Sequence, residues 1–170
     1  MPEMENQAES KTGGRRIRLT VAYDGTGYLG WQYQPNGPTV QGELENALSS
    51  LQAGQGRVIG AGRTDAGVHA LGQVAHFDTD SRLDCRVLER ALNSLLPRDI
   101  RVREVMETGP AFHARYSASA RCYRYSLADQ GLPESVLLRR TCWVRQTALP
   151  GRELLDRCAG LLVGKHDFFT

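Results

Sequence analysis

One carboxylate and one arginine on a glycine-rich stretch are the residues of this chain best suited to chemistry. They lie in Gly62-Arg63-Thr64-Asp65-Ala66-Gly67-Val68-His69-Ala70, where Asp65 follows Arg63 by two positions. A short acidic side chain on a glycine-flanked loop is held where a substrate can reach it. A neighbouring arginine favours the ionised carboxylate and is also a fork-shaped ligand for phosphate. The stretch therefore predicts chemistry on a polyanion.

The elements that must position this loop are predicted from the spacing of apolar residues. Residues 16–23 alternate between apolar and polar side chains, which indicates a half-buried strand ending in the turn cluster Asp24-Gly25-Thr26-Gly27. Apolar residues at helical spacing over 40–51 predict a helix, with Thr39 as its N-cap. Residues 57–60 are expected to form a short strand that leads into the loop.

Three further elements complete a recognisable layout. Residues 72–77 are predicted as a strand, 84–95 as a helix capped by Asp84, and 100–103 as another strand. The order β-α-β-β-α-β predicts an α+β fold with a ferredoxin-like first unit, in which two helices cover one face of an antiparallel sheet. The other face of such a sheet is free to hold a ligand or an RNA strand.

A second unit is expected after the break at Gly109-Pro110. Its predicted elements are a strand over 119–127, a partner strand over 141–145 and a helix over 151–163. Because two strands and one helix do not close a domain, we expect this unit to be incomplete. The predicted organisation is a disordered tail over 1–14, a ferredoxin-like subdomain with the catalytic loop over 15–109, and an incomplete second subdomain over 110–170.

Composition excludes several classes of protein. With 41% hydrophobic and 24% charged residues the chain reads as a globular protein, and no apolar run is long enough to span a bilayer. The four cysteines form no close pair, so they offer no metal clip and are expected to be reduced in the cytoplasm. Between residues 111 and 145, six arginines stand against two acidic residues. That excess fits an RNA-binding groove and a solvated basic face equally well.

Residues 60–70, followed by 72–77, resemble the signature of the tRNA pseudouridine synthase A family. Other stretches match the family in the same order along the chain. They are Tyr23–Gln32, Val40–Glu45, Phe112–Arg115, Arg124 with its two flanking tyrosines, and Gly164–Phe168. The resemblance runs from about Arg16 to the last residue.

The resemblance implies a pseudouridine synthase fold and the isomerisation of uridine to pseudouridine in the tRNA anticodon stem-loop, at about positions 38 to 40. It implies tRNA as partner, a homodimer in the full-length form, no metal, no organic cofactor and no membrane. Asp65 is the implied essential carboxylate. Arg63 is implied to hold the flipped nucleotide or to fill the space it leaves. Tyr123 is implied to stack on the uracil, with Tyr125 as the second choice.

The residues leave three questions open. Asp65 could attack C1′, stabilise positive charge there, or act as a base at C2′. The chain could instead be a non-catalytic RNA-binding module, or an interaction domain in which Arg63 and Asp65 form a structural pair. Members of the family continue well past this length, so we expect the chain to be truncated and to be inactive or unstable alone.

Overall fold

The structure, a computed structural model, describes residues 14–53, 56–128, 139–144 and 149–167. The chain divides into two compact units, Met1–Arg121 and Cys122–Thr170, and each is described here by itself. The tail predicted over 1–14 lies outside the described residues, apart from Gly14.

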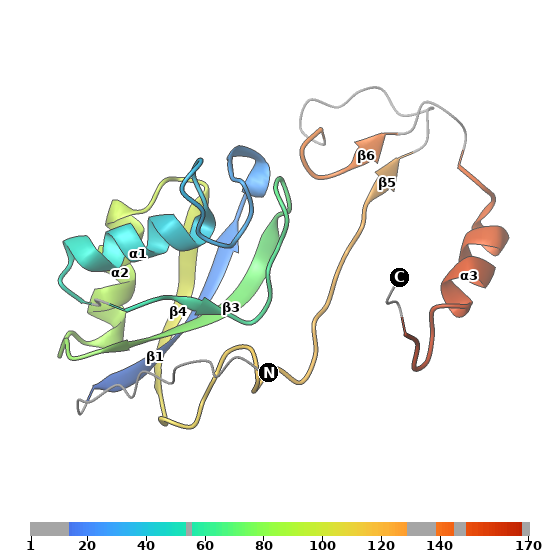
Figure 1. Cartoon of the computed structure of the whole chain (residues 1–170). Helices are drawn as coiled ribbons and strands as arrows, with labels where there is room; N and C mark the ends of the chain where they lie inside the picture. Colours follow the sequence, from blue (N-terminus) through green and yellow to red (C-terminus); the bar gives the residue numbers. More distant parts are fainter. Residues whose placement is uncertain (1–13, 54–55, 129–138, 145–148, 168–170) are drawn as a thin grey trace, which may run out of the picture. The chain divides into compact units, whose positions relative to one another are not determined.

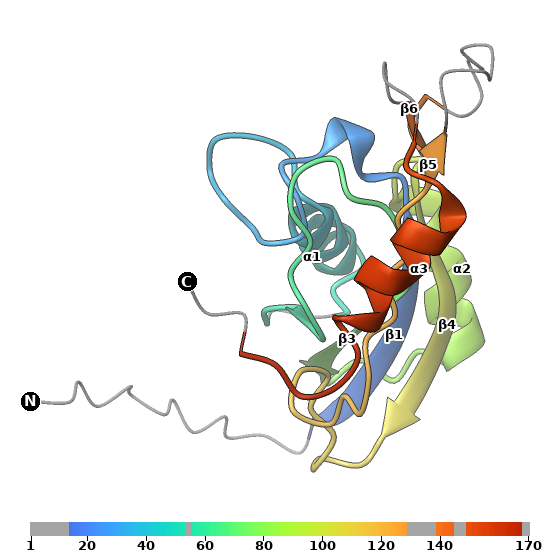
Figure 2. The same cartoon turned by 90° about the vertical axis from the view of Figure 1, so that its right-hand side faces the viewer.

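The first unit is built on a four-stranded antiparallel sheet in the order β2-β3-β1-β4. Figure 2 shows β3, β1 and β4 side by side. In the middle of the sheet, Ile17 lies opposite Phe77 of β3 and Glu107 of β4. The strands are β1 (Arg15–Tyr23), β2 (Ile59–Gly60), β3 (Ala70–Thr79) and β4 (Ile100–Thr108).

Two helices, α1 (Val40–Ser50) and α2 (Cys85–Leu95), cover one face of this sheet (Figure 1). Both N-caps are the predicted ones. The side chain of Thr39 accepts from the Gly42 amide, and that of Asp84 accepts from the Arg86 amide. The predicted β-α-β-β-α-β order is confirmed, with one addition: a 3-10 helix, η1 (Gly25–Gly27), between β1 and α1.

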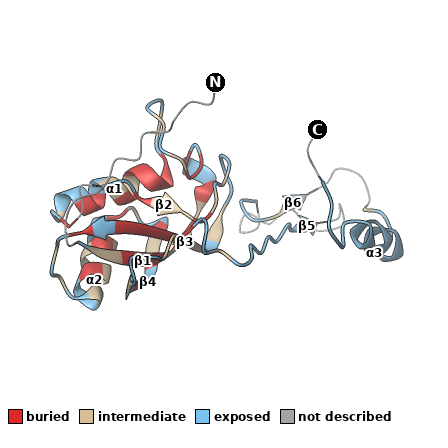
Figure 3. Cartoon of the chain, turned by 60° about the horizontal axis from the view of Figure 1, so that its bottom comes forward, coloured by how far each residue is buried: buried red, intermediate tan, exposed pale blue. Residues whose placement is uncertain are grey.

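The core lies between the sheet and the helices (Figure 3). Strand β1 alternates as predicted: its inward side chains are buried and its outward ones are partly exposed. Each fully buried aliphatic side chain contributes about 1.5–3 kcal/mol to the stability of the fold, compared with the same side chain left exposed. The completely buried members from β1 and the two helices are Ile17, Leu19, Val21, Val40, Leu44, Leu88 and Leu92.

The outer face of the sheet carries ion pairs. Arg16 bonds Asp78 across β1 and β3 at 2.7 Å, and Arg18 bonds Glu104 across β1 and β4. The hydrogen bond from Arg16 lowers the pKa of the Asp78 carboxyl. Because these pairs are half exposed, each contributes at most about 1 kcal/mol to stability.

The segment after β4 folds back onto this outer face. Arg16 Nη1 donates to the Phe112 carbonyl at 2.7 Å, and the Ala114 amide donates to His76 Nδ1 at 3.1 Å. Arg121 Nη2 donates to the Ala61 carbonyl at 2.6 Å. Residues 110–121, which the sequence assigned to the second subdomain, therefore cluster with the first unit.

The described part of the second unit contains β5 (Leu127–Ala128), β6 (Trp143–Val144) and α3 (Arg152–Gly160). Strands β5 and β6 pair in parallel, and the Trp143 amide donates to the Ser126 carbonyl at 2.9 Å. The long strand predicted over 119–127 is wrong. Among the described residues, 119–125 pair with no strand and Ser126 contributes only its carbonyl, so the alternating pattern lacks the ladder that a strand requires.

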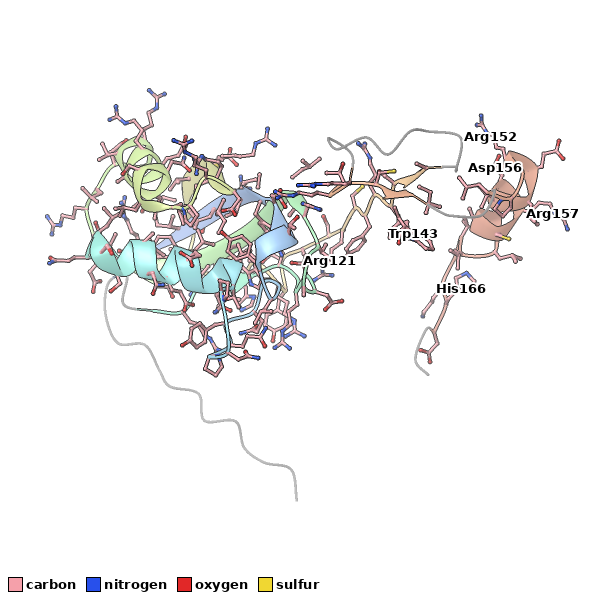
Figure 4. The ribbon with its side chains drawn as sticks, turned by 90° about the horizontal axis from the view of Figure 1, so that it is seen from above. Arg121, Trp143, Arg152, Asp156, Arg157 and His166 are labelled. Carbon is pink, nitrogen blue, oxygen red and sulfur yellow. The ribbon has the colours of Figure 1, made fainter. Side chains whose placement is uncertain are left out.

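Helix α3 ends three residues before its predicted end. The amides of Leu161, Leu162 and Val163 donate to carbonyls three residues back, so the last turn tightens instead of continuing the α-helix. Gly164 follows at φ +121°, a conformation that only glycine adopts readily. No residue of α3 is buried, and Figure 4 shows Arg152, Asp156 and Arg157 projecting from it.

Candidate active site on the Gly62–Ala70 loop

Asp65 lies on the loop that joins β2 to β3, and its side chain is exposed. The loop turns directly after it: the Val68 amide donates to the Asp65 carbonyl at 3.2 Å. Gly67 occupies this turn at φ +78°, which a residue with a Cβ adopts only at a cost of about 1–2 kcal/mol. The glycine in the motif therefore sets the backbone that presents the carboxylate.

The segment between β1 and α1 holds the loop from one side. The Trp31 amide donates to the Thr64 carbonyl at 2.9 Å. The hydroxyls of Tyr23 and Thr64 are hydrogen-bonded at 2.8 Å, directly beside Asp65. Both bonds involve the residue preceding the carboxylate, so they restrict where Asp65 can lie.

Two glycines of that segment allow its close approach to the loop. A Cβ at Gly25 would lie 2.0 Å from the Val68 carbonyl oxygen, and one at Gly30 would lie 2.5 Å from the Thr64 carbonyl oxygen. Gly30 also has φ +99°. The Tyr23-Asp24-Gly25-Thr26-Gly27-Tyr28-Leu29-Gly30-Trp31 stretch thus supports the loop by backbone contact.

A contact between a histidine and an aspartate closes the far end of the loop. His69 Nδ1 lies 3.1 Å from Asp24 Oδ1. The same Asp24 oxygen accepts from the Thr26 amide at 3.0 Å, which caps η1. The residue that starts the supporting segment is therefore also bound to the end of the loop.

Two side chains bind the beginning of the loop through its carbonyls. Gln73 Nε2 donates to the Gly62 carbonyl, and Arg121 Nη2 donates to the Ala61 carbonyl, both at 2.6 Å. Figure 4 labels Arg121 at the end of the first unit. These hydrogen bonds hold the loop from both sides, and none of them involves the side chain of Arg63 or Asp65.

Arg63 and Asp65 are both exposed, and within the described residues neither side chain has a hydrogen-bond or ion-pair partner. The ion pair between Arg63 and Asp65 that the interaction-domain alternative requires is not formed. An unpaired carboxylate and an unpaired guanidinium on a fixed backbone are both available to a bound polyanion. This arrangement disfavours the hypothesis of a purely structural pair.

Tyr123 belongs to the second unit, which is described separately from the loop. Its side chain is 76% exposed, as is that of Tyr125. Tyr125 contacts Trp143 edge to face, with ring centres 6.5 Å apart. Both tyrosines fall in the predicted strand over 119–127, but residues 119–126 form no strand, so neither ring lies on a strand face.

Within the ranges that the structure describes, no group of three or more His, Cys, Asp or Glu side chains could hold a metal ion. No helix in those ranges is both long enough and apolar enough to cross a membrane.

Similarity to known proteins covers this loop and its supports. A family model described as tRNA pseudouridine synthase matches residues 19–117, which is more than half of the chain. The tRNA pseudouridine synthase A of Geobacter sp. strain M21 is 48% identical over 154 residues, covering 91% of this chain and 62% of the relative. That of Ruminiclostridium cellulolyticum is 44% identical, covering 92% and 63%, and that of Rhodospirillum rubrum is 46% identical, covering 90% and 55%.

The chain thus spans about three fifths of the length of these relatives. The family match contains β1 from Leu19 onward, both helices of the first unit, the whole loop around Asp65 and the folded-back segment as far as Ser117. The chain belongs to the tRNA pseudouridine synthase family.

Proposed function

We propose that the protein carrying this chain converts uridine to pseudouridine in the anticodon stem-loop of tRNA, at about positions 38 to 40, with Asp65 as the essential carboxylate. The observation that carries the proposal is the exposed, unpaired Asp65 on a loop whose backbone is bound on both sides. The family match to residues 19–117 includes every one of these contacts except the one from Arg121.

The reaction explains why a carboxylate is needed. The N1–C1′ bond of uridine breaks, the uracil rotates, and a C5–C1′ bond forms; N1 gains a proton and C5 loses one. An ionised Asp65 can attack C1′, stabilise positive charge at C1′, or remove a proton at C2′. All three roles require an oxygen that can reach the ribose without a competing internal partner, and the proposal is supported by an exposed Asp65 that has no such partner among the described residues.

We assign Arg63 and Tyr123 to substrate binding. A paired uridine must leave the base stack before it reacts, at a cost of a few kcal/mol. The exposed Arg63 guanidinium, two residues before Asp65, is suited to the phosphate of the flipped nucleotide or to the space it vacates. The exposed ring of Tyr123 is suited to stack on the uracil, and its phenol could receive the proton from C5.

The remaining parts of the proposal follow from the family. We propose that the catalytic-loop subdomain predicted over 15–109 extends through residues 110–121, and that residues 122–170 are part of a second subdomain. We also propose a homodimer as the active form and a cytoplasmic location. No metal or organic cofactor takes part in the proposed reaction, because the carboxylate supplies its chemistry.

Substitution of Asp65 tests the proposal. Asp65→Asn should abolish pseudouridine formation in transcribed tRNA while tRNA binding remains, because the amide has nearly the same shape without the charge. Asp80→Asn is the matched control, since Asp80 is an exposed aspartate outside the loop, and should leave both properties unchanged. The assay uses this chain and, if the reading frame continues, the whole protein.

The alternatives give different results in the same assay. A non-catalytic RNA-binding module binds tRNA but forms no pseudouridine before any substitution. An interaction domain does not bind tRNA. Pseudouridine formation that survives Asp65→Asn would remove Asp65 from the mechanism.

A further inference from the structure

The six residues Phe112–Ser117, here called the FHARYS turn, form a closed turn on the outer face of the sheet. The Ser117 amide donates to the His113 carbonyl at 2.7 Å, and the His113 amide donates back to Ser117 Oγ at 3.0 Å. Arg16 and His76 bind this turn from below through the Phe112 carbonyl and the Ala114 amide. Because Ala114 is 2% exposed, the turn is seated on the sheet and does not hang free.

Three aromatic rings contact one another in a row that runs from the sheet to the surface of this turn. The buried ring of His76 contacts that of His113 at 4.7 Å between centres, and His113 stacks on Tyr116 at 4.3 Å with the rings 27° apart. The amides of Arg115 and Tyr116 both donate to His113 Nδ1, which fixes the middle ring. The row of rings begins at the buried His76 and ends at the exposed Tyr116.

The outermost ring is open to solvent. Tyr116 is 78% exposed although His113 supports it, and the guanidinium carbon of Arg115 lies 5.9 Å from its centre. Arg115 has no carboxylate partner among the described residues. An exposed aromatic ring that is already ordered loses little conformational entropy when a flat ligand stacks on it.

We propose that the FHARYS turn is a stacking platform for an unpaired base of the RNA substrate, with Tyr116 beneath the base and Arg115 at its phosphate. Proteins hold single-stranded RNA by stacking its bases on aromatic rings beside positive charge, and every base offers the required flat face. A guanidinium beside the ring that has no carboxylate partner among the described residues favours a nucleotide over an apolar protein segment as the occupant. This inference rests on the proposed function, because it takes the substrate to be RNA.

The turn is joined to the candidate active site within the first unit. Seven residues after Ala114, Arg121 donates to the Ala61 carbonyl, and its side chain lies 3.2 Å from the position of a Cβ on Gly62. One short stretch of chain therefore runs from the platform to the start of the loop that carries Asp65. A strand of RNA with a base on Tyr116 would have neighbouring nucleotides in reach of this stretch.

Binding of a labelled single-stranded oligouridylate of about eight nucleotides, followed by fluorescence anisotropy, tests the platform. Tyr116→Leu keeps an apolar side chain but removes the ring, and should raise Kd about tenfold or more. Tyr116→Phe keeps the ring and should leave Kd within about twofold. Tyr33→Leu is the control, because Tyr33 is an exposed tyrosine of the same unit with no stacked histidine, and should not change Kd.

The platform is overturned if Tyr116→Leu binds as tightly as the parent, or if Tyr33→Leu weakens binding as much. Pseudouridine formation measured on the same variants separates the two proposals. A Kd that depends on the Tyr116 ring, in a full-length protein that forms no pseudouridine, supports the platform and refutes the proposed function. If the protein forms pseudouridine and Tyr116→Leu leaves Kd and KM unchanged, the proposed function is supported and the platform is refuted.

Discussion

Two glycines in the same 3-10 helix give a direct test of how the loop around Asp65 is supported. A Cβ on Gly25 would lie 2.0 Å from the Val68 carbonyl oxygen, whereas a Cβ on Gly27 meets nothing within 4 Å. Neither glycine has a positive φ, so alanine at either position differs only in the space available. Gly25→Ala and Gly27→Ala therefore form a matched pair.

The displacement follows from the geometry. To reach an ordinary contact of 3.4 Å, the Val68 oxygen must move by 3.4 − 2.0 = 1.4 Å relative to the new methyl group. The Val68 amide is bonded to the Asp65 carbonyl, so part of this shift is transmitted to the carboxylate. Overpacking of this kind costs about 1–3 kcal/mol. At about 4 °C per kcal/mol, Tm should fall by about 4–12 °C.

Two measurements check this prediction. Calorimetry should show a lower Tm for Gly25→Ala and an unchanged Tm for Gly27→Ala. Single-turnover pseudouridine formation should slow by about a hundredfold for Gly25→Ala, because a misplacement of about 1 Å has that effect on a reacting group. Equal Tm values for the two variants would refute the close packing of η1 on the loop, whether or not the protein is active.

Three further predictions concern stability, each measured by urea denaturation. Tyr23→Phe removes the bond to the Thr64 hydroxyl and should lower the free energy of unfolding by about 1 kcal/mol; no loss would mean that this bond does not hold the loop. Leu92→Ala empties a fully buried position and should cost about 2–5 kcal/mol, whereas Leu95→Ala on the same helix, at a position 48% exposed, should cost about 0.5 kcal/mol or less. Burial, with Arg16 and His113 nearby, lowers the pKa of His76 from 6.5 to about 4. Between pH 4 and pH 6.5 the unfolded chain therefore binds a proton at His76 that the folded chain does not. The free energy of unfolding should rise over this range by at most about 3 kcal/mol. His76→Asn should reduce this dependence on pH, and an unchanged dependence would contradict a lowered pKa of His76.

Most of the first unit could be predicted because its sequence pattern repeats the geometry of its elements. The alternation of Ile17, Leu19 and Val21 places one side of β1 in the core, and the apolar spacing of α1 and α2 does the same for the helices. Prediction failed over 119–126, where the residues alternate but no strand of the described residues pairs with 119–125. A strand depends on its partner, which local pattern does not reveal.

The candidate site was predictable in its residues but not in its contacts. Arg63 and Asp65 stand two positions apart, yet their side chains form no pair, because sequence proximity does not determine side-chain direction. The support from Gly25 and Gly30 comes from a segment far away in the sequence. Tyr116 was overlooked, although its place directly after Arg115 offered the combination of an aromatic ring and a cation that marks RNA-binding surfaces.

The central position of β1 has a consequence for how the chain folds. Strand β1 precedes every other element of its sheet, yet it pairs with β4 through contacts such as that of Thr108 with Arg16, 92 residues apart. During synthesis one edge of β1 stays unpaired until β3 has been released from the ribosome, and the other edge until residues up to about Thr108 have been released. Such non-local pairing is slow to form, so folding of this unit should take milliseconds to seconds. Strand β1, with its alternating apolar side chains and unpaired edges, is thus prone to aggregation while the chain is being made.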